Sequence, residues 1–67
     1  IVRILLNGKN KINKFNINIQ DVVKSMKVDK KYVAVALNGE FISKKDYNKH
    51  LLEDGDIVEV VTPHPGG

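Results

Sequence analysis

The chain has 67 residues, no cysteine and a formal net charge of +3. A chain of this length forms one small domain that buries only about 60% of its unfolded surface, and it lacks any thiol for a disulfide, a metal ion or nucleophilic catalysis. No apolar run approaches the roughly 20 residues that cross a bilayer, and no signal peptide is recognisable, so we expect a soluble, cytoplasmic protein without membrane partners.

The basic residues are mostly lysines scattered along the chain, with adjacent pairs only at Lys30–Lys31 and Lys44–Lys45. Two phenylalanines and two tyrosines are present, and they do not alternate with a basic cluster. Nucleic-acid-binding domains concentrate positive charge on one face. The pattern therefore predicts a solvated lysine-rich surface and no nucleic-acid partner.

The amino-terminal segment is predicted to be a β-hairpin. Residues 1–6 are apolar and β-branched at their start, and Asn7–Gly8 tolerates the positive φ angles of a tight turn. In the returning strand Ile12 is out of step with Phe15 and Ile17. Either a β-bulge or a shifted strand boundary would explain this.

An amphipathic helix follows the hairpin. Four apolar residues at positions i, i+3, i+4 and i+7 form one helical face: Ile19, Val22, Val23 and Met26. Asn18 can cap the helix, and Asp21 in its first turn suits the helix dipole. So short a helix needs a packing partner.

The second half of the chain predicts three further strands. Residues 33–37 alternate, Asn38–Gly39 is a strong hairpin signal, and residues 40–42 form a short partner strand. Residues 44–56 form a connection with one helical turn that ends in turn residues, and the β-branched residues 57–61 form the last strand.

These elements predict an α+β domain with a mixed sheet of four to five strands packed on one main helix. The last strand is too apolar for a sheet edge, so we place it centrally, beside the first strand and parallel to it. The domain is expected to span residues 1–61, and residues 62–67 form a flexible tail that ends in Gly66–Gly67.

The side chains offer no recognisable catalytic or metal-binding arrangement. No motif links the hydroxyl residues to His50 or His64, and two histidines without cysteine fall short of the usual ligand set for a metal. The acidic residues at positions 53–56 are typical of a turn before a strand. We therefore expect that the protein is not an enzyme and binds no metal or tightly held cofactor.

The carboxyl-terminal segment Thr62–Gly67 suits the delivery of a carboxylate. Pro63 and Pro65 stiffen the chain, which reaches roughly 20 Å over these residues. Gly66 and Gly67 lack side chains and can enter a narrow channel. An inert, frayed terminus is the alternative.

Three stretches and the terminal glycines together resemble the sulfur carrier proteins of thiamine biosynthesis, the ThiS family of the ubiquitin-like β-grasp superfamily. The stretches are "ILLNG", "VAVALNGEFI" and "DYNKHLLEDGDIVEVV", which contains Tyr47 where the family often has tryptophan. The segment Pro63–Pro65 replaces the small or apolar residues that usually precede the glycines.

The resemblance implies a reaction cycle at Gly67. A ThiF-like adenylating enzyme would use ATP and Mg²⁺ to activate the Gly67 carboxylate, and a persulfide donor such as a cysteine desulfurase would supply sulfur. The resulting thiocarboxylate would pass sulfur to thiazole synthase, with Gly66 as the slim tip. The small subunit of molybdopterin synthase, a ubiquitin-like protein modifier and a binding module with an inert tail remain alternatives.

Overall fold

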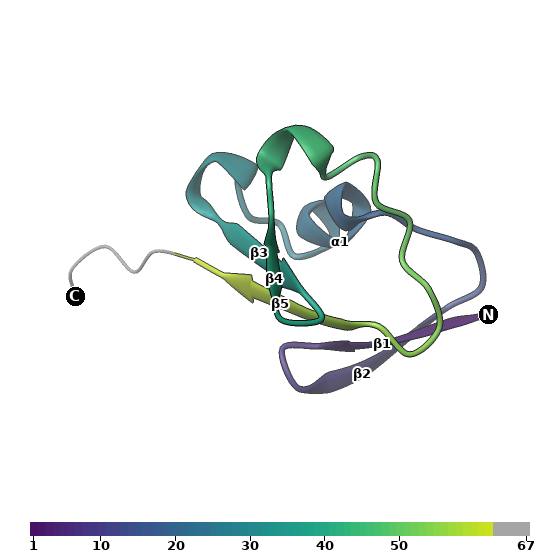
Figure 1. Ribbon diagram of the computed structural model, residues 1–67. Helices are drawn as coiled ribbons and strands as arrows, with labels where there is room; N and C mark the ends of the chain where they lie inside the picture. The colour runs from purple at the N-terminus through teal and green to yellow at the C-terminus, as the bar shows by residue number, and fades with distance from the viewer. Residues whose placement is uncertain (63–67) are drawn as a thin grey trace.

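A five-stranded mixed sheet forms one layer of the molecule, and α1 (Ile19–Ser25) packs on one of its faces (Figure 1). The computed structural model describes residues 1–62, with Lys30 described through its backbone only. The strands lie in the order β2-β1-β5-β3-β4. Their bounds are β1 Val2–Leu6, β2 Lys9–Asn13, β3 Ala34–Leu37, β4 Glu40–Ile42 and β5 Ile57–Val61.

The last strand, β5, is the centre of the sheet. It pairs in parallel with β1 and antiparallel with β3. Its residues alternate strictly, with Val58 and Val60 buried and Ile57, Glu59 and Val61 exposed. The predicted central position and parallel pairing are therefore confirmed.

Two Asn-Gly turns close the hairpins that flank β5 in the sheet. Asn7 and Gly8 have φ angles of 49° and 81°, and Asn38 and Gly39 have φ angles of 52° and 89°. Asparagine and glycine are the residues that adopt such angles at the lowest cost. The pairing of β1 with β2 keeps one regular register up to Val2 and Asn13, without a bulge. The strand boundary before Phe15 thus explains why Ile12 is out of step.

The short helix α1 is held by its cap and by its apolar face. Asn18 Oδ1 accepts a hydrogen bond from the Asp21 amide (2.8 Å), and an Asp21 carboxylate oxygen accepts one from the Asn18 amide (3.0 Å). This reciprocal capping box satisfies two amides that the helix leaves unpaired. Ile19, Val22 and Val23 are buried against the sheet, as the predicted spacing requires.

The core also contains two residues that the sequence pattern did not indicate. Tyr47 and Leu52 are 1% and 2% exposed and come from the connection between β4 and β5. This connection begins with a 3₁₀ turn at Lys44–Asp46, as predicted, and a second, unpredicted 3₁₀ turn lies at Lys30–Tyr32. The full cluster of buried residues is Val2, Ile4, Leu6, Ile19, Val22, Val23, Val33, Val35, Tyr47, Leu52, Val58 and Val60.

Backbone hydrogen bonds fix the connection on the amino-terminal end of α1. The Gln20 amide donates to the Tyr47 carbonyl (3.1 Å), and the Leu52 amide donates to the Ile17 carbonyl (2.8 Å). The connection therefore covers one end of the core without forming a strand of its own. Across residues 1–62, no helix is long and apolar enough to cross a membrane.

Stability should depend on which face of the sheet a valine occupies. Val35 is fully buried, and its cross-strand partner is the buried Val60. We expect Val35→Ala to lower the free energy of unfolding by about 1–3 kcal/mol, because it removes two buried methyl groups and leaves a cavity. Urea denaturation measures this change.

The matched control is Val61→Ala, because Val61 lies in the same sheet but is 52% exposed. It should change the free energy of unfolding by less than about 0.5 kcal/mol. Equal effects of the two substitutions would contradict the assignment of the two faces.

Candidate functional site

The root of the predicted tail lies at the end of the central strand. Val61 pairs with Ala34 of β3 and ends β5, and Thr62 follows it. The predicted reacting residues Gly66 and Gly67, like His64 and the two prolines, lie outside the residues that the structure describes. The structure therefore defines how the chain reaches its carboxyl-terminal segment.

The side chain of Asn7 holds the last part of β5. The β1 ladder ends at Leu6 and Val58, so β5 continues beyond it. There Asn7 Oδ1 accepts a hydrogen bond from the Val60 amide (2.8 Å), and Asn7 Nδ2 donates one to the Val60 carbonyl (3.3 Å). The Asn7 amide also donates to the Val58 carbonyl (2.9 Å). One turn residue thus extends the sheet towards the tail.

Asn38, in the other Asn-Gly turn, holds the beginning of β5. Its amide donates to the Ile57 carbonyl (2.7 Å), and its Oδ1 accepts from the Ile57 amide (2.9 Å). Its Nδ2 donates to Asp56 Oδ1 (3.1 Å). Both ends of β5 are therefore fixed by an asparagine in the left-handed conformation.

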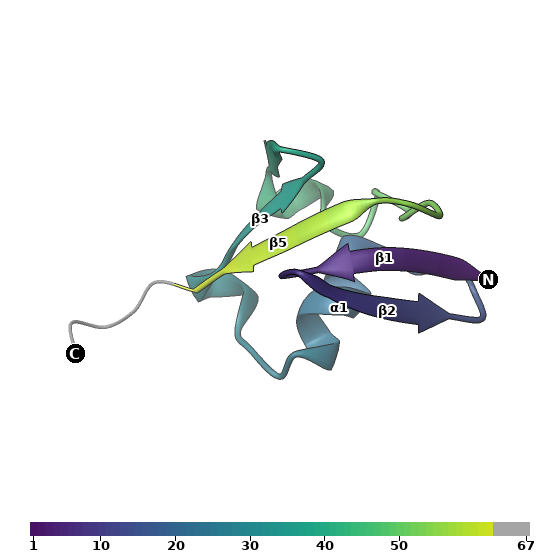
Figure 2. The same ribbon diagram turned by 90° about the horizontal axis from the view of Figure 1, so that it is seen from below.

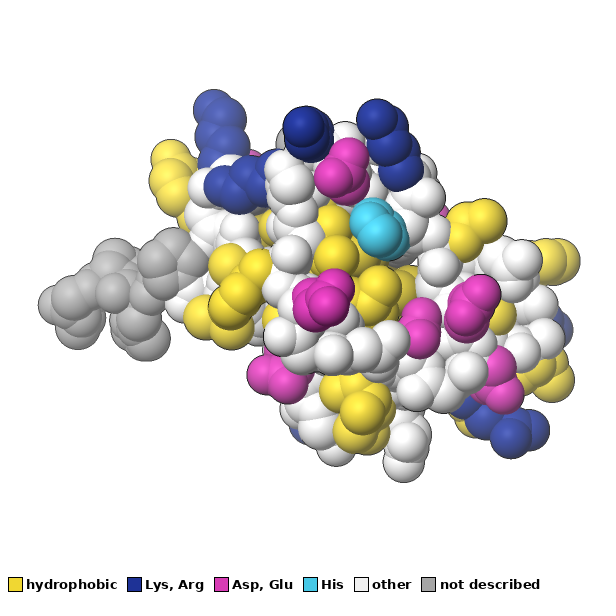
Figure 3. Space-filling view, in the orientation of Figure 1, with side chains coloured by type: hydrophobic (Ala, Val, Ile, Leu, Met, Phe, Trp, Pro, Cys, Tyr) yellow, Lys and Arg dark blue, Asp and Glu magenta, His cyan; other side chains and the backbone are white. Residues whose placement is uncertain are grey.

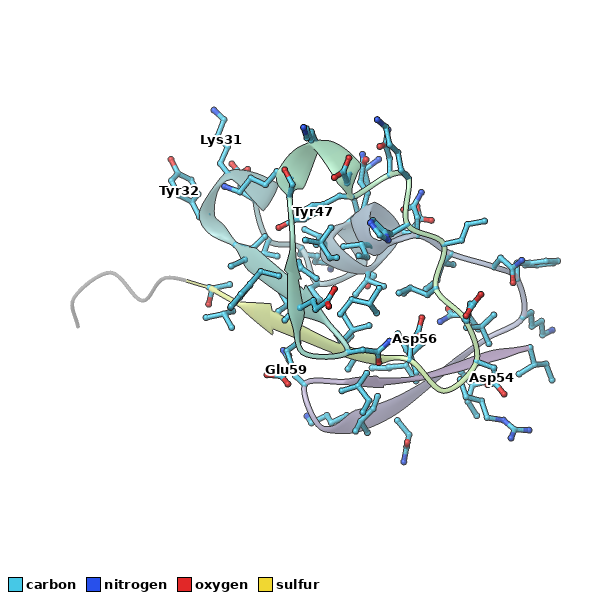
Figure 4. All side chains as sticks on the ribbon, viewed as in Figure 1. Lys31, Tyr32, Tyr47, Asp54, Asp56 and Glu59 are labelled. Carbon is cyan, nitrogen blue, oxygen red and sulfur yellow. The ribbon has the colours of Figure 1, made fainter. Side chains whose placement is uncertain are left out.

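The predicted turn before β5 is confirmed, and its aspartate side chains accept hydrogen bonds from backbone amides. Asp56 Oδ2 accepts from the Glu53 amide (2.7 Å), and Asp54 Oδ1 accepts from the Arg3 amide (2.8 Å). Figure 4 shows Asp54 and Asp56 on this turn, away from Glu59 in the middle of β5. These carboxylates act on backbone amides, and within residues 1–62 no three histidine or acidic side chains group together in a way that could hold a metal ion.

Three further groups that could carry chemistry lie apart from the end of β5. Ser25 Oγ donates to the Val22 carbonyl (2.7 Å), and Tyr47 is buried in the core. His50 is half-buried, and its carbonyl accepts from the Ile19 amide (3.2 Å). None of these three side chains lies at Thr62.

A shallow hollow of about 330 Å³ adjoins the root of the tail. Lys44 Nζ donates a hydrogen bond to the Lys31 carbonyl (2.6 Å). This bond connects the two 3₁₀ turns beside the hollow. Figure 4 shows Lys31 and Tyr32 projecting at the end of the molecule where β5 ends. The hollow is lined by Lys31, Tyr32, Val33, Ala34, Lys44 and Val61. It offers a partner both apolar contacts and ammonium groups beside the emerging chain.

The sheet face opposite α1 carries exposed apolar residues around Glu59, and we call it the outer face. Figure 2 views the molecule from this side, with α1 behind the sheet. Ile57, Val61 and Phe41 are 45%, 52% and 73% exposed there. The strand registers place the following outward-facing residues on it: Arg3, Leu5, Asn10, Ile12, Ala34, Ala36, Phe41, Ile57, Glu59 and Val61. An exposed apolar surface of this kind is typical of a protein interface.

Charges of both signs occur on the face shown in Figure 3. Lysine and arginine side chains lie mostly at its rim, and carboxylates are spread between them. This face therefore carries no continuous basic surface of the kind that follows a nucleic-acid backbone.

The comparisons with known proteins agree on one family. The model of the ThiS family matches residues 2–67. The sulfur carrier protein ThiS of Bacillus subtilis (strain 168) is 40% identical over 63 residues, which cover 92% of this chain and 96% of that protein.

Solved structures give the same result. The crystal structure of a thiamine biosynthesis protein (ThiS) from Geobacter metallireducens is 29% identical, with a TM-score of 0.80 over 98% of this chain and 100% of that one. The NMR solution structure of a thiamine biosynthesis protein from the same organism is 28% identical, with a TM-score of 0.82 over 98% of this chain and 88% of that one. The predicted ubiquitin-like β-grasp fold is confirmed.

The hydrogen bonds of Asn7 can be tested one at a time. Asn7→Gly keeps a turn that allows positive φ but removes both bonds to Val60, whereas Asn7→Asp keeps an acceptor for the Val60 amide. Each bond contributes about 1 kcal/mol, so the Val60 amide should exchange with solvent about fivefold faster or more in Asn7→Gly. Asn7→Asp should lie between Asn7→Gly and the parent.

Hydrogen exchange followed by NMR gives the rate at each amide. The Ala36 amide, which faces Glu59 in the central pairing of β3 with β5 and is away from Asn7, reports on opening of the sheet and serves as the internal control. Equal Val60 exchange rates in all three proteins would show that Asn7 does not hold the end of β5.

Proposed function

Because this chain belongs to the ThiS family, we propose that it is a sulfur carrier protein of thiamine biosynthesis, with Gly67 as the residue that carries sulfur. The observation that carries this proposal is the family match, which extends over residues 2–67 and so includes Gly66 and Gly67. The relative from Bacillus subtilis, itself described as a sulfur carrier, supports it over almost its full length.

The chemistry starts from a carboxylate, which is a poor electrophile and contains no sulfur. An oxygen of the Gly67 carboxylate attacks the α-phosphorus of ATP on a ThiF-like adenylating enzyme, and pyrophosphate leaves. The terminal sulfur of a persulfide then attacks the acyl carbon and displaces AMP. Cleavage of the remaining sulfur–sulfur bond by a thiol leaves a thiocarboxylate on Gly67.

The thiocarboxylate sulfur is the nucleophile that thiazole synthase takes up. In this cycle the chain is a co-substrate, and its partners supply the catalytic groups, the ATP and the Mg²⁺. Gly66 and Gly67 add no side chain to the chain end, so it can enter a narrow active site. We place the cycle in the cytoplasm, where ATP is available.

Partners bind the folded domain, and this binding positions the carboxyl terminus. The end of β5 is fixed by Asn7 on one side and by β3 on the other. The outer face is continuous with that end, because Val61 belongs to both. We propose that the adenylating enzyme docks on the outer face and on the hollow beside Thr62.

The alternatives differ in their products. The small subunit of molybdopterin synthase would form the same thiocarboxylate but would bind the large subunit of that enzyme. A protein modifier would form isopeptide bonds to lysines. Membership of the ThiS family favours thiazole synthase as the acceptor.

Extending the chain by one alanine after Gly67 tests the position of the carboxylate. The extension moves the carboxylate by roughly 3.3–3.6 Å. A misplacement of about 1 Å can cost a hundredfold in an oriented reaction, so ATP–pyrophosphate exchange with the adenylating enzyme should fall by at least that factor. The melting temperature should not change, because the addition lies beyond the core.

Gly66→Val keeps the carboxylate in register but adds a β-branched side chain and restricts the backbone. It should also suppress the exchange reaction without changing the melting temperature. The mass of the intact protein after incubation with ATP and a sulfide source measures thiocarboxylate formation directly. Exchange at the parental rate by the untrimmed, alanine-extended protein would exclude the carrier function.

Ile57→Glu tests the outer face as a docking surface. Ile57 is 45% exposed and lies opposite Leu5 in the middle of this face. A carboxylate there would be buried without a partner in the complex, so the dissociation constant for the adenylating enzyme should rise by roughly tenfold or more. Isothermal titration calorimetry measures this constant.

Leu51→Glu is the matched control, because Leu51 is 61% exposed but bridges to Asn18 on the helix side of the molecule. It should leave the dissociation constant unchanged. If Leu51→Glu weakens the complex and Ile57→Glu does not, the adenylating enzyme docks on the helix side instead.

A further inference from the structure

A groove runs between the edge strand β2 and α1, on the side of the sheet opposite the outer face. It consists of two adjoining hollows of about 320 and 370 Å³ that share Leu6, Lys11 and Ser25. Ile4 and Val22, both buried, lie at the bottom of the first hollow, and half-buried Met26 lines the second. The groove therefore has an apolar floor that the fold leaves partly uncovered.

The strand beside the groove has a free edge. β2 forms one of the two edges of the sheet, and among residues 1–62 its only partner strand is β1 (Figure 2). A free edge presents backbone amides and carbonyls that a further extended strand can pair with. The groove thus lies alongside a template for strand addition.

Lysines stand where the helix-facing side of β2 would otherwise be apolar. Lys9 and Lys11 are opposite Leu6 and Ile4, so they share the helix-facing side with these core residues. Both lysines are exposed and line the groove near the hairpin turn. At the other end, Asp21 lines the groove but already accepts a hydrogen bond from the Asn18 amide. The end of the groove near the turn is therefore cationic.

We propose that this groove binds an extended segment of a partner protein, in which apolar residues precede or follow a pair of acidic residues. The segment adds to the free edge of β2. Its carboxylates lie beside Lys9 and Lys11, and its helix-facing apolar side chains lie beside Asn13, where Ile17 and Val22 line the first hollow. Main-chain pairing supplies affinity, and the pockets and charges supply specificity.

The charge of β2 favours such a partner over a second copy of this strand. Two copies of β2 paired edge to edge would bring Lys9 and Lys11 of each together, and lysines on an edge prevent pairing of this kind. An acidic segment is attracted by the same side chains. Because the groove and the outer face lie on opposite sides of the sheet, both can be occupied at the same time.

The test uses the full chain labelled with ¹⁵N and two end-blocked peptides, Glu-Thr-Glu-Thr-Val-Thr-Val and the same residues in reverse order. The two orders allow for parallel and antiparallel addition. In a titration followed by NMR, amide shifts should concentrate at residues 9–13 and 21–26. A Lys9→Glu/Lys11→Glu variant should bind the acidic peptide roughly tenfold more weakly or worse, and it should bind a peptide with lysine in place of glutamate.

Lys45→Glu is the matched control, since Lys45 is exposed on the 3₁₀ turn Lys44–Asp46 and should leave the affinity unchanged. The proposal would be overturned by an absence of shifts along β2 and α1, by equal affinity in the double variant, or by shifts confined to the outer face. Shifts of β2 amides that grow with protein concentration in the absence of peptide would assign the groove to a second copy and also overturn it.

Discussion

The placement of β5 between β1 and β3 is the constraint on which the rest of the molecule depends. Its inward valines contact the core, its outward residues form the middle of the outer face, and its last residue leads into the carboxyl-terminal segment. The β1 ladder covers only Leu5 and Leu6, so backbone pairing alone leaves the far end of β5 open on that side. The Asn7 side chain bonds the Val60 backbone there. The first hairpin turn therefore helps to hold the end of β5, from which the carboxyl-terminal segment continues.

The two faces of the sheet have different roles, because one forms the core and the other is exposed. The face towards α1 is covered by the helix and by Tyr47 and Leu52, whereas no other element within residues 1–62 covers the exposed apolar residues of the outer face. A small domain needs the first face to fold. The second face is free for partners, and a substitution on it can change binding without changing the core.

Most strands, both hairpin turns and the helix could be predicted from the sequence, because each has a local signal. Asn-Gly pairs mark turns, and the spacing of Ile19, Val22 and Val23 marks a helical face. Tyr47 and Leu52 could not be predicted as core, since their segment has no periodicity. The role of Asn7 depends on Val60, 53 positions away, and no local pattern reports such a contact. Gly66 and Gly67 are proposed as site residues from the sequence alone, whereas the contacts at the end of β5 required the structure.

The parallel pairing of β1 and β5 also has a mechanical consequence. These strands lie next to each other, and one is near each end of the chain. A force that pulls the two ends apart acts along the strand axes in opposite directions. It therefore shears the hydrogen bonds between the strands together instead of opening them one after another. A domain loaded in this direction resists extension, so a pull on Val61 against the start of β1 does not open the sheet strand by strand.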